Sequence, residues 1–296
     1  MKQTHHFRSG LLAVTVLAAF LSMTPKAGAS LISLLGPAGD YAVLGINGAI
    51  TNLSSGPLRI YGNVGEGDSS QLNFSGGGQI VGRVDYAPSA TLNTGGNIIT
   101  GGTHQMSFSP VQQAVQNMVN FANSLSATQS FSSITSPMTL TSTASQNVIS
   151  IANDIHLSGG NLTLSGSASD VFIFKISGTM ELSGNTNIIL TGGLTADNVL
   201  WDFIGSGSQF QTSGQSRTAG IFLAPDRVIN INGGIHNSEF ISGVSLSFQS
   251  NPQITQPVPE VTPSSMIFGF LGLLVAVSSR RALAARFRRV AIRNGR

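Results

Sequence analysis

Short segments of alternating apolar and polar residues, each ended by Gly, Asn or Ser, constrain the fold of this chain more than any other feature. From Asn147 onward they follow one another at intervals of roughly 8 to 12 residues, as in NVISIA, NLTLSG, VFIFKIS, NIILTGG, NVLWDF, GIFLAP and RVININGG. The earlier segments YAVLGI, LRIYGNV and QIVGRV repeat the theme. Short strands with glycine corners suit either a β-sandwich or a β-solenoid.

We favour the β-solenoid, because the spacing persists and charged residues make up only 9% of the chain. The Gly and Asn corners also tolerate positive φ. In a solenoid each strand pairs with the coils above and below it. The chain has no cysteine, which excludes disulfides, Cys–zinc sites and a Cys nucleophile. We expect the ladder of backbone hydrogen bonds to take the place of disulfides.

One segment breaks the alternation and predicts a helix at about residues 109–126. Ser109 is placed to cap this helix, and Pro110 suits its first turn. Its apolar residues share one face: Val111, Ala114, Val115, Met118, Ala122 and Leu125. We expect the helix to lie along the solenoid and cover its apolar side, with Gln and Asn facing water.

The N-terminal residues predict a secretion signal. A basic start is followed by the apolar stretch LLAVTVLAAFLSM and by Ala27, Gly28 and Ala29. Signal peptidase recognises small residues in the positions of Ala27 and Ala29. We therefore predict a signal peptide over residues 1–29 that forms an N-terminal signal helix, with Ser30 as the first mature residue. The alternative is an uncleaved N-terminal anchor.

The other end predicts a membrane anchor. After a linker at residues 255–263, residues 266–277 are all apolar or glycine, and flanking serines extend this segment to 264–279. A length of 16 residues is marginal for a transmembrane helix. Residues 280–296 form a basic tail. A buried core helix is the alternative. Arginine clusters after an apolar segment stay in the cytoplasm. The residues expected to stop transfer are Arg280, Arg281, Arg286, Arg288 and Arg289.

Val258, Pro259 and Glu260, followed by this apolar segment and its arginines, resemble the PEP-CTERM sorting signal of Gram-negative bacteria. The resemblance implies recognition and processing by exosortase, a membrane protease, and association with exopolysaccharide, biofilm or the outer surface. The same kind of tail is also named an ice-binding protein C-terminal domain. Val261 stands where a second Pro is common, and the basic tail is longer than usual.

A second resemblance covers about residues 35 to 254. LGPAGDYAVLGINGAIT, IYGNVGEG, the helix, VFIFKI with NVLWDF, and GIFLAPDRV are similar to the ice-binding-like adhesin family and to choice-of-anchor A surface proteins. The resemblance implies a mainly β fold: a discontinuous β-solenoid over residues 30–254 with one long helix packed alongside. It implies ice binding only where a flat, threonine-rich face is present.

Threonines are scattered in the sequence. Thr139, Thr141 and Thr143 form one T-x-T-x-T stretch, while Thr163 and Thr191 recur singly. An ice-binding face needs a regular ladder of small hydroxyl and methyl groups over several coils, and the sequence shows no such ladder.

The charge of the solenoid argues against nucleic acid as a partner. Residues 30–257 contain 5 basic and 11 acidic side chains, a net charge of 5 − 11 = −6. The basic residues that set the overall balance of +3 lie in the leader and in the tail. Nucleic-acid binding needs a basic surface on the folded part.

Candidate catalytic and metal-binding residues are few. His104, His156 and His236 are isolated. Asp154 and His156 are two residues apart, so on one strand they would face the same side and could form a metal or acid–base pair. The alternative is a solvated loop pair.

Carboxylates offer other candidates. Glu66 and Asp68 could bind Ca²⁺, although their loop lacks the usual number of ligands. Asp197, Asp202 and Asp226 are of the type that glycosidases use, and Arg227 is placed for a corner ion pair with Asp226. Trp201 and Phe203 could stack on sugars if exposed, but a buried position is the alternative we prefer.

The sequence therefore predicts an exported structural or adhesive surface protein, held at the inner membrane with its body in the periplasm and then delivered to the cell envelope or extracellular matrix. We expect no catalytic residue, metal or cofactor. The predicted partners are an exosortase-type protease, the inner membrane and exopolysaccharide, and not nucleic acid. The alternatives are an ice- or carbohydrate-binding protein and, third, a polysaccharide-acting enzyme.

Overall fold

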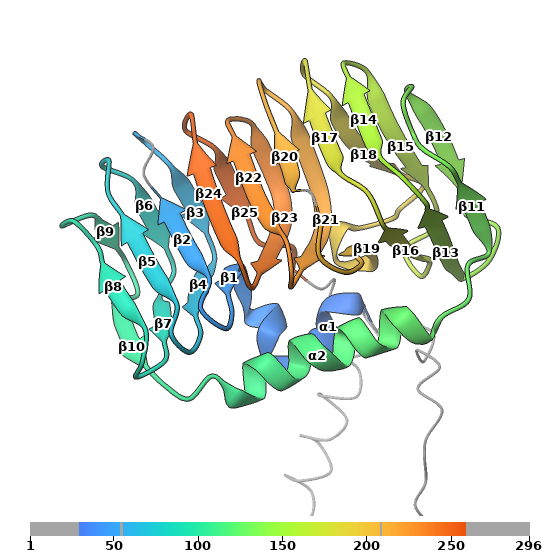
Figure 1. The fold of residues 1–296 in the computed structure, drawn as a ribbon. Coiled ribbons are helices and arrows are strands. Elements are labelled where there is room, and N and C mark those ends of the chain that lie inside the picture. Colours follow the sequence, from blue (N-terminus) through green and yellow to red (C-terminus); the bar gives the residue numbers. More distant parts are fainter. Residues whose placement is uncertain (1–29, 54–55, 208, 259–296) are drawn as a thin grey trace, which may run out of the picture.

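The chain folds into a β-solenoid with three faces, as the alternating segments predict (Figure 1). The computed structural model describes residues 30–53, 56–207 and 209–258. The predicted signal peptide, Pro259, Glu260, the apolar segment 264–279 and the arginine tail lie outside these residues. All ladders between the named strands are parallel, so each coil stacks on its neighbours in the same direction (for example β13 on β16 and β17 on β20).

Face 1 is the face nearest to the helices. Along the solenoid its strands run in the order β10 (Thr103–Gln105), β7 (Val84–Tyr86), β4 (Asn63–Glu66), β1 (Tyr41–Gly45), β23 (Ile235–Ser242), β21 (Arg217–Ala224), β19 (Val199–Phe203), β16 (Val171–Ile176), β13 (Gln146–Ile151) and β11 (Gln129–Phe131).

Face 2 is a separate eight-stranded sheet. Its strands run in the order β14 (Ile155–Ser158), β17 (Met180–Ser183), β20 (Phe210–Thr212), β22 (Val228–Asn232), β24 (Ser245–Gln249), β2 (Ile50–Leu53), β5 (Gln71–Phe74) and β8 (Thr91–Asn93).

Face 3 completes each coil. It contains β9 (Ile98–Ile99), β6 (Gln79–Val81), β3 (Arg59–Tyr61), β25 (Gln253–Thr255), the first residues of β23 and β21, and then β18 (Asn187–Thr191), β15 (Asn161–Ser165) and β12 (Met138–Thr141). Because β21 and β23 run through both faces, faces 1 and 3 join into one 17-stranded sheet.

The solenoid is discontinuous in sequence. β1, from the start of the chain, pairs with β4 on one side and with β23 on the other. In the same way, β2 pairs with β24 and β3 with β25. The N-terminal coils therefore extend from the middle of the solenoid toward one end. The chain then crosses to the other end, and the later coils stack from there back to the middle.

Helix α2 (Ser109–Ser124) connects the two ends and lies where the sequence predicts a helix (Figure 1). Five of its six predicted apolar residues are buried (Val111, Ala114, Val115, Met118 and Ala122), and Leu125 follows the helix and is partly buried. The prediction that Ser109 caps the helix is wrong: the capping position belongs to Phe108, and its side chain makes no capping hydrogen bond. Pro110 occupies the first turn, as expected.

Two apolar clusters hold these layers together. The larger one fills the solenoid and includes stacked rings of Phe174, Trp201 and Phe222, which lie in register on three consecutive strands. The second lies between face 1 and the helices α2, α1 (Leu31–Leu35) and the short η1 (Gly36–Asp40). A third short helix, η2 (Ala196–Asn198), precedes β19. Within the described residues, no helix is both long and apolar enough to span a membrane.

Candidate functional site

Faces 2 and 3 are the two faces that none of the described helices covers. Face 2 carries an unbroken column of outward side chains in register from strand to strand. Along the sheet the column reads His156, Glu181, Gln211, Asn230, Ser247, Asn52, Asn73 and Asn93. Six consecutive strands thus present an uncharged amide or hydroxyl at the same position, spaced at the roughly 4.8 Å that separates paired strands.

Hydrogen bonds hold the amides of this column in place. Asn73 donates to Asn52 over 3.1 Å across two strands, and Gln71 donates to Asn73 over 3.1 Å along one strand. On the other half of the sheet, Asn230 donates to Gln209 over 2.7 Å. The side chains therefore stand in fixed positions on the sheet.

Inward residues explain why these side chains face water. On each side of the amide column, the alternate residues point into the core: Leu72 and Phe74 flank Asn73, and Leu246 and Phe248 flank Ser247. Burial of large apolar groups at every second position fixes the register, since a shift of one residue would expose them.

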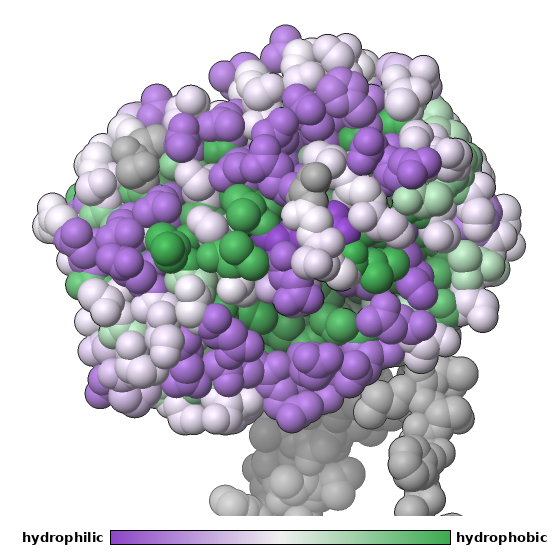
Figure 2. Space-filling model, in the orientation of Figure 1, coloured by the Kyte–Doolittle hydropathy of each residue, from purple (hydrophilic) through white to green (hydrophobic). Residues whose placement is uncertain are grey.

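Figure 2 shows mainly hydrophilic residues with separate apolar patches on the side that faces the viewer in Figure 1.

Charge on face 2 is confined to one end of the column. His156 and Glu181 are neighbours on β14 and β17, with Nδ1 and the carboxylate 3.2 Å apart. Asp154 instead accepts a hydrogen bond of 2.7 Å from the backbone of Thr179. The structure therefore gives His156 a different acidic neighbour from the one proposed from the sequence.

Face 3 gathers the threonines that look scattered in the sequence. Thr139 lies opposite Thr163, and Thr141, Ser165 and Thr191 follow one another on three adjacent strands. This patch ends at Arg217, which pairs with Asn187. Elsewhere the face carries Arg59, Gln79 and Gln253 together with the exposed Ile98, Ile235 and Val81. Face 3 therefore carries arginines within its sheet, whereas the charged residues of face 2 lie at one end.

Glu66 and Asp68, the predicted calcium ligands, lie on opposite sides of the solenoid wall. Glu66 is fully buried inside the solenoid, and burial raises the pKa of its carboxyl to about 8. Asp68 lies outside and accepts from Gln112 of α2 over 3.0 Å. No group of three or more His, Asp or Glu residues in the described ranges could hold a metal ion.

The three carboxylates proposed from the sequence are divided between two places. Asp202 and Asp226 border a cavity between α2 and the solenoid, whereas Asp197 lies at another hollow beside Pro257 and Val258. Arg227, the neighbour of Asp226, is buried and donates to the carbonyls of Ser177, Gly178, Ile204 and Gly205. The sequence analysis did not predict this cavity, because α2 and the strands that border it are far apart in the chain.

Aromatic residues offer no exposed sugar platform on β19. Trp201 is fully buried and donates from Nε1 to the carbonyl of Ala219 over 2.9 Å, and Phe203 is 1% exposed. The preferred interpretation of both residues as core residues is confirmed.

His236 is likewise an interior residue. Nε2 lies 2.8 Å from the carbonyl of Gly233 and therefore donates to it, which leaves Nδ1 to accept from the hydroxyl of Thr218 at 2.9 Å. Burial lowers the pKa of His236 to about 4. This histidine is neutral and structural.

Known proteins with similar sequences point to one family. The model of a family described as ice-binding-like matches residues 45–251. An ice-binding protein of Nostoc sp. (strain HG1) is 28% identical over 281 residues, which cover 90% of this chain and 94% of that protein. One of Flavobacterium frigoris (strain PS1) is 38% identical over 53 residues, 18% of this chain and only 19% of that protein.

Solved structures agree on the fold. The crystal structure of an ice-binding protein from an Antarctic Flavobacteriaceae bacterium superposes with a TM-score of 0.58 at 22% identity, over 80% of this chain and 49% of that one. The chain thus spans about half the length of this structural relative. The proteins named in these comparisons are all described as ice-binding proteins.

Proposed function

The chain belongs to the ice-binding-like family, and from this premise we propose that it binds ice through face 2. The named relatives are ice-binding proteins, which supports this function over a purely structural role. The observation that carries the choice of face is the in-register column of uncharged side chains from Gln211 to Asn93.

Binding to a crystal surface requires many weak contacts at once, so the protein surface must be flat, repetitive and rigid. Face 2 is repetitive and rigid, because its strands pair in register and its amides are fixed by hydrogen bonds. Uncharged groups also lose less hydration energy than charged ones when they meet a solid surface. The threonine patch on face 3 is shorter and borders an arginine.

A bulky side chain on each face tests the proposal. Asn73→Tyr places a ring on the column of uncharged side chains on face 2, and Thr163→Tyr is the matched change on face 3. We expect Asn73→Tyr to lower ice-recrystallisation inhibition and partition into growing ice by about tenfold, because a raised side chain breaks many contacts together. Thr163→Tyr should leave both activities near those of the wild type.

Two results would overturn this assignment. If the wild-type chain fails to enter growing ice, it does not bind ice. If Thr163→Tyr abolishes binding while Asn73→Tyr is silent, the ice-binding surface is the threonine patch on face 3. Circular dichroism of each variant checks that the fold is intact.

We further propose that the protein is exported and sorted through its C-terminal segment. The support is sequence alone: the signal peptide over residues 1–29, and the order of Val258–Pro259–Glu260, apolar segment and arginines. Val258 is the last described residue and is 75% exposed, so the start of the motif is accessible. An exosortase-type protease would process this segment after it enters the inner membrane.

In this proposal the solenoid reaches the cell envelope or extracellular matrix, where exopolysaccharide is its expected neighbour. Mass spectrometry of the mature C-terminus, after fractionation of the cells, tests the processing step. Cleavage near Glu260 is the expected result. Recovery of intact Arg296 in the inner membrane would contradict processing.

A further inference from the structure

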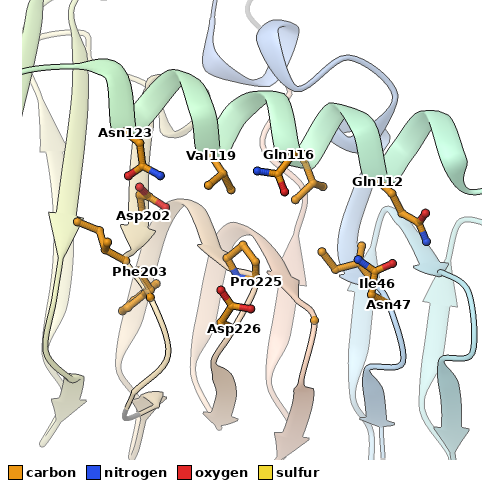
Figure 3. A pocket seen from close by; sticks show the side chains of 14 residues that line it. Ile46, Asn47, Gln112, Gln116, Val119, Asn123, Asp202, Phe203, Pro225 and Asp226 are labelled. Carbon is orange, nitrogen blue, oxygen red and sulfur yellow. The ribbon is translucent and has the colours of Figure 1, made fainter.

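A groove runs between helix α2 and the corners where the chain passes from face 1 to face 2. It encloses about 330 Å³ and is bordered by α2 on one side and by the turns at residues 46–47, 204–205, 225–226 and 243 on the other. This size lies within the range of small-molecule sites, roughly 300–1,000 Å³. Figure 3 shows side chains entering the groove from both walls.

The helical wall of the groove mixes amides and methyl groups. Gln112, Val115, Gln116, Val119 and Asn123 line it. Their spacing places them along one stripe of the helix that faces the solenoid. At 1.5 Å per residue the stripe is about 16 Å long. An extended ligand lying along the helix would meet polar and apolar groups in turn.

The opposite wall holds a carboxylate with an oxygen that lacks a partner. Asp202 is 2% exposed and lines the groove, and its Oδ2 has no hydrogen-bond partner among the residues that the structure describes. In Figure 3 its carboxylate points toward Asn123. A buried acceptor without a donor costs about 1–3 kcal/mol, so a donor supplied by a ligand would be favourable here.

Nearby cations do not fill this place. Lys175 lies beside Asp202 on the adjacent strand, but its ammonium donates to the carbonyls of Asn123 and Leu125 at the end of α2. Arg227 donates to main-chain carbonyls on the other side. Burial raises the pKa of Asp202 to about 7, while both cations act in the opposite direction.

The residues that line the groove select for the charge of the ligand. Of the described residues, those that line the groove include two carboxylates, Asp202 and Asp226, and no Lys, Arg or His. An anionic ligand would be repelled, and a bare metal ion would leave most of the volume unused. Hydroxyl groups, in contrast, can donate to Asp202 and exchange hydrogen bonds with Gln112, Gln116 and Asn123.

From this geometry we infer that the groove between α2 and the solenoid binds a short segment of a neutral polysaccharide. Sugar hydroxyls satisfy Asp202 and the helix amides, and the C–H faces of the rings pack on Val115, Val119 and Ile46. This site lies apart from face 2 and therefore adds a second function to the proposed binding of ice.

The test titrates the full chain with neutral disaccharides, namely cellobiose, maltose and diacetylchitobiose, and with the acidic digalacturonate. Saturation-transfer NMR and calorimetry provide the readout. We expect at least one neutral sugar to bind with a Kd of about 1 mM, and digalacturonate not to bind. Gln116→Leu should weaken binding about tenfold, the size of one lost hydrogen bond. Asp202→Ala should weaken it at least as much.

Gln113→Leu is the matched control, because Gln113 is an exposed helix residue that pairs with Asn117 outside the groove. The inference is overturned if none of the neutral sugars binds, if digalacturonate binds as well as they do, or if Gln113→Leu weakens binding as much as Gln116→Leu. Ice partition of Gln116→Leu should equal that of the wild type, so failure of this site and failure of face 2 can be told apart.

Discussion

The hydroxyl of Tyr41 donates a hydrogen bond of 3.0 Å to Asp85, across a distance of 44 residues in the sequence. Asp85 is fully buried and also accepts from Nε of Arg83, at 2.7 and 2.8 Å from its two oxygens. His104 on the end strand β10 lies 3.5 Å from the same carboxylate. One buried acid thus ties three coils together near the start of α2.

Asp85→Asn should destabilise the fold, because an amide cannot serve Tyr41 and Arg83 as a charged acceptor does. We expect a loss of about 2–4 kcal/mol in the free energy of unfolding, measured by urea denaturation. Asp154→Asn, at an exposed aspartate, is the control and should cost less than about 1 kcal/mol. Equal losses in the two variants would show that the buried network contributes nothing special.

Glu66→Gln should raise stability at alkaline pH. The folded-state pKa of about 8 lies above the ordinary 4.5, so the folded state binds more protons between these values. Glu66 therefore lowers the free energy of unfolding by nothing below pH 4.5, where its carboxyl is neutral in both states. As the pH rises from 4.5 through 8, the free energy of unfolding falls by up to about 5 kcal/mol. Thermal unfolding of variant and wild type should agree at the acidic limit and diverge toward pH 8. Parallel curves would contradict burial of this carboxyl.

His236→Gln tests a dependence of stability on pH that has the opposite sign. The folded-state pKa of about 4 lies below the ordinary 6.5, so the unfolded state binds more protons in this range. The wild type should lose about 3 kcal/mol, relative to the variant, as the pH falls from 6.5 to 4. The measurement is the difference between the two unfolding free energies at each pH. If that difference is constant, His236 titrates normally and is not enclosed.

Gly220→Ala tests the corner at which β21 passes from face 3 to face 1. Gly220 has φ of +121°, and an added Cβ would lie 2.7 Å from Nε1 of Trp201. We expect a destabilisation of about 3 kcal/mol by chemical denaturation. Gly205→Ala is the control: its φ is +66° and the site is open, so backbone strain alone should cost about 1 kcal/mol.

The repeating pattern of the sequence predicts the strands well, and the physical reason is local. Alternation places Leu72 and Phe74 on one side of a strand, and burial of those side chains decides the register without further information. The same holds for α2, whose apolar stripe is visible in its own residues. Alternation does not decide burial on β19, because all five of its residues are buried, between the core and the helices.

What the residues alone could not give is the order in which the coils stack. Thr163 and Thr191 become parts of one patch only because β12, β15 and β18 are adjacent, and Asp202 meets Asn123 only because α2 returns along face 1. The sequence indicates Glu66 as a loop ligand for Ca²⁺, whereas the structure buries it inside the solenoid. Those relationships depend on contacts between distant segments, which no local pattern encodes.

The pairing of early strands with late ones, such as β1 with β23 and β2 with β24, has a consequence for folding. Ser245 bonds to the carbonyl of Ile50 across 195 residues, and Gln256 bonds to that of Gly39 across 217. The first coils to be synthesised therefore keep an open strand edge until nearly the whole solenoid has followed. Such long-range closure slows folding, and an uncovered edge invites pairing with foreign strands. We expect the incomplete solenoid to be prone to aggregation during that interval.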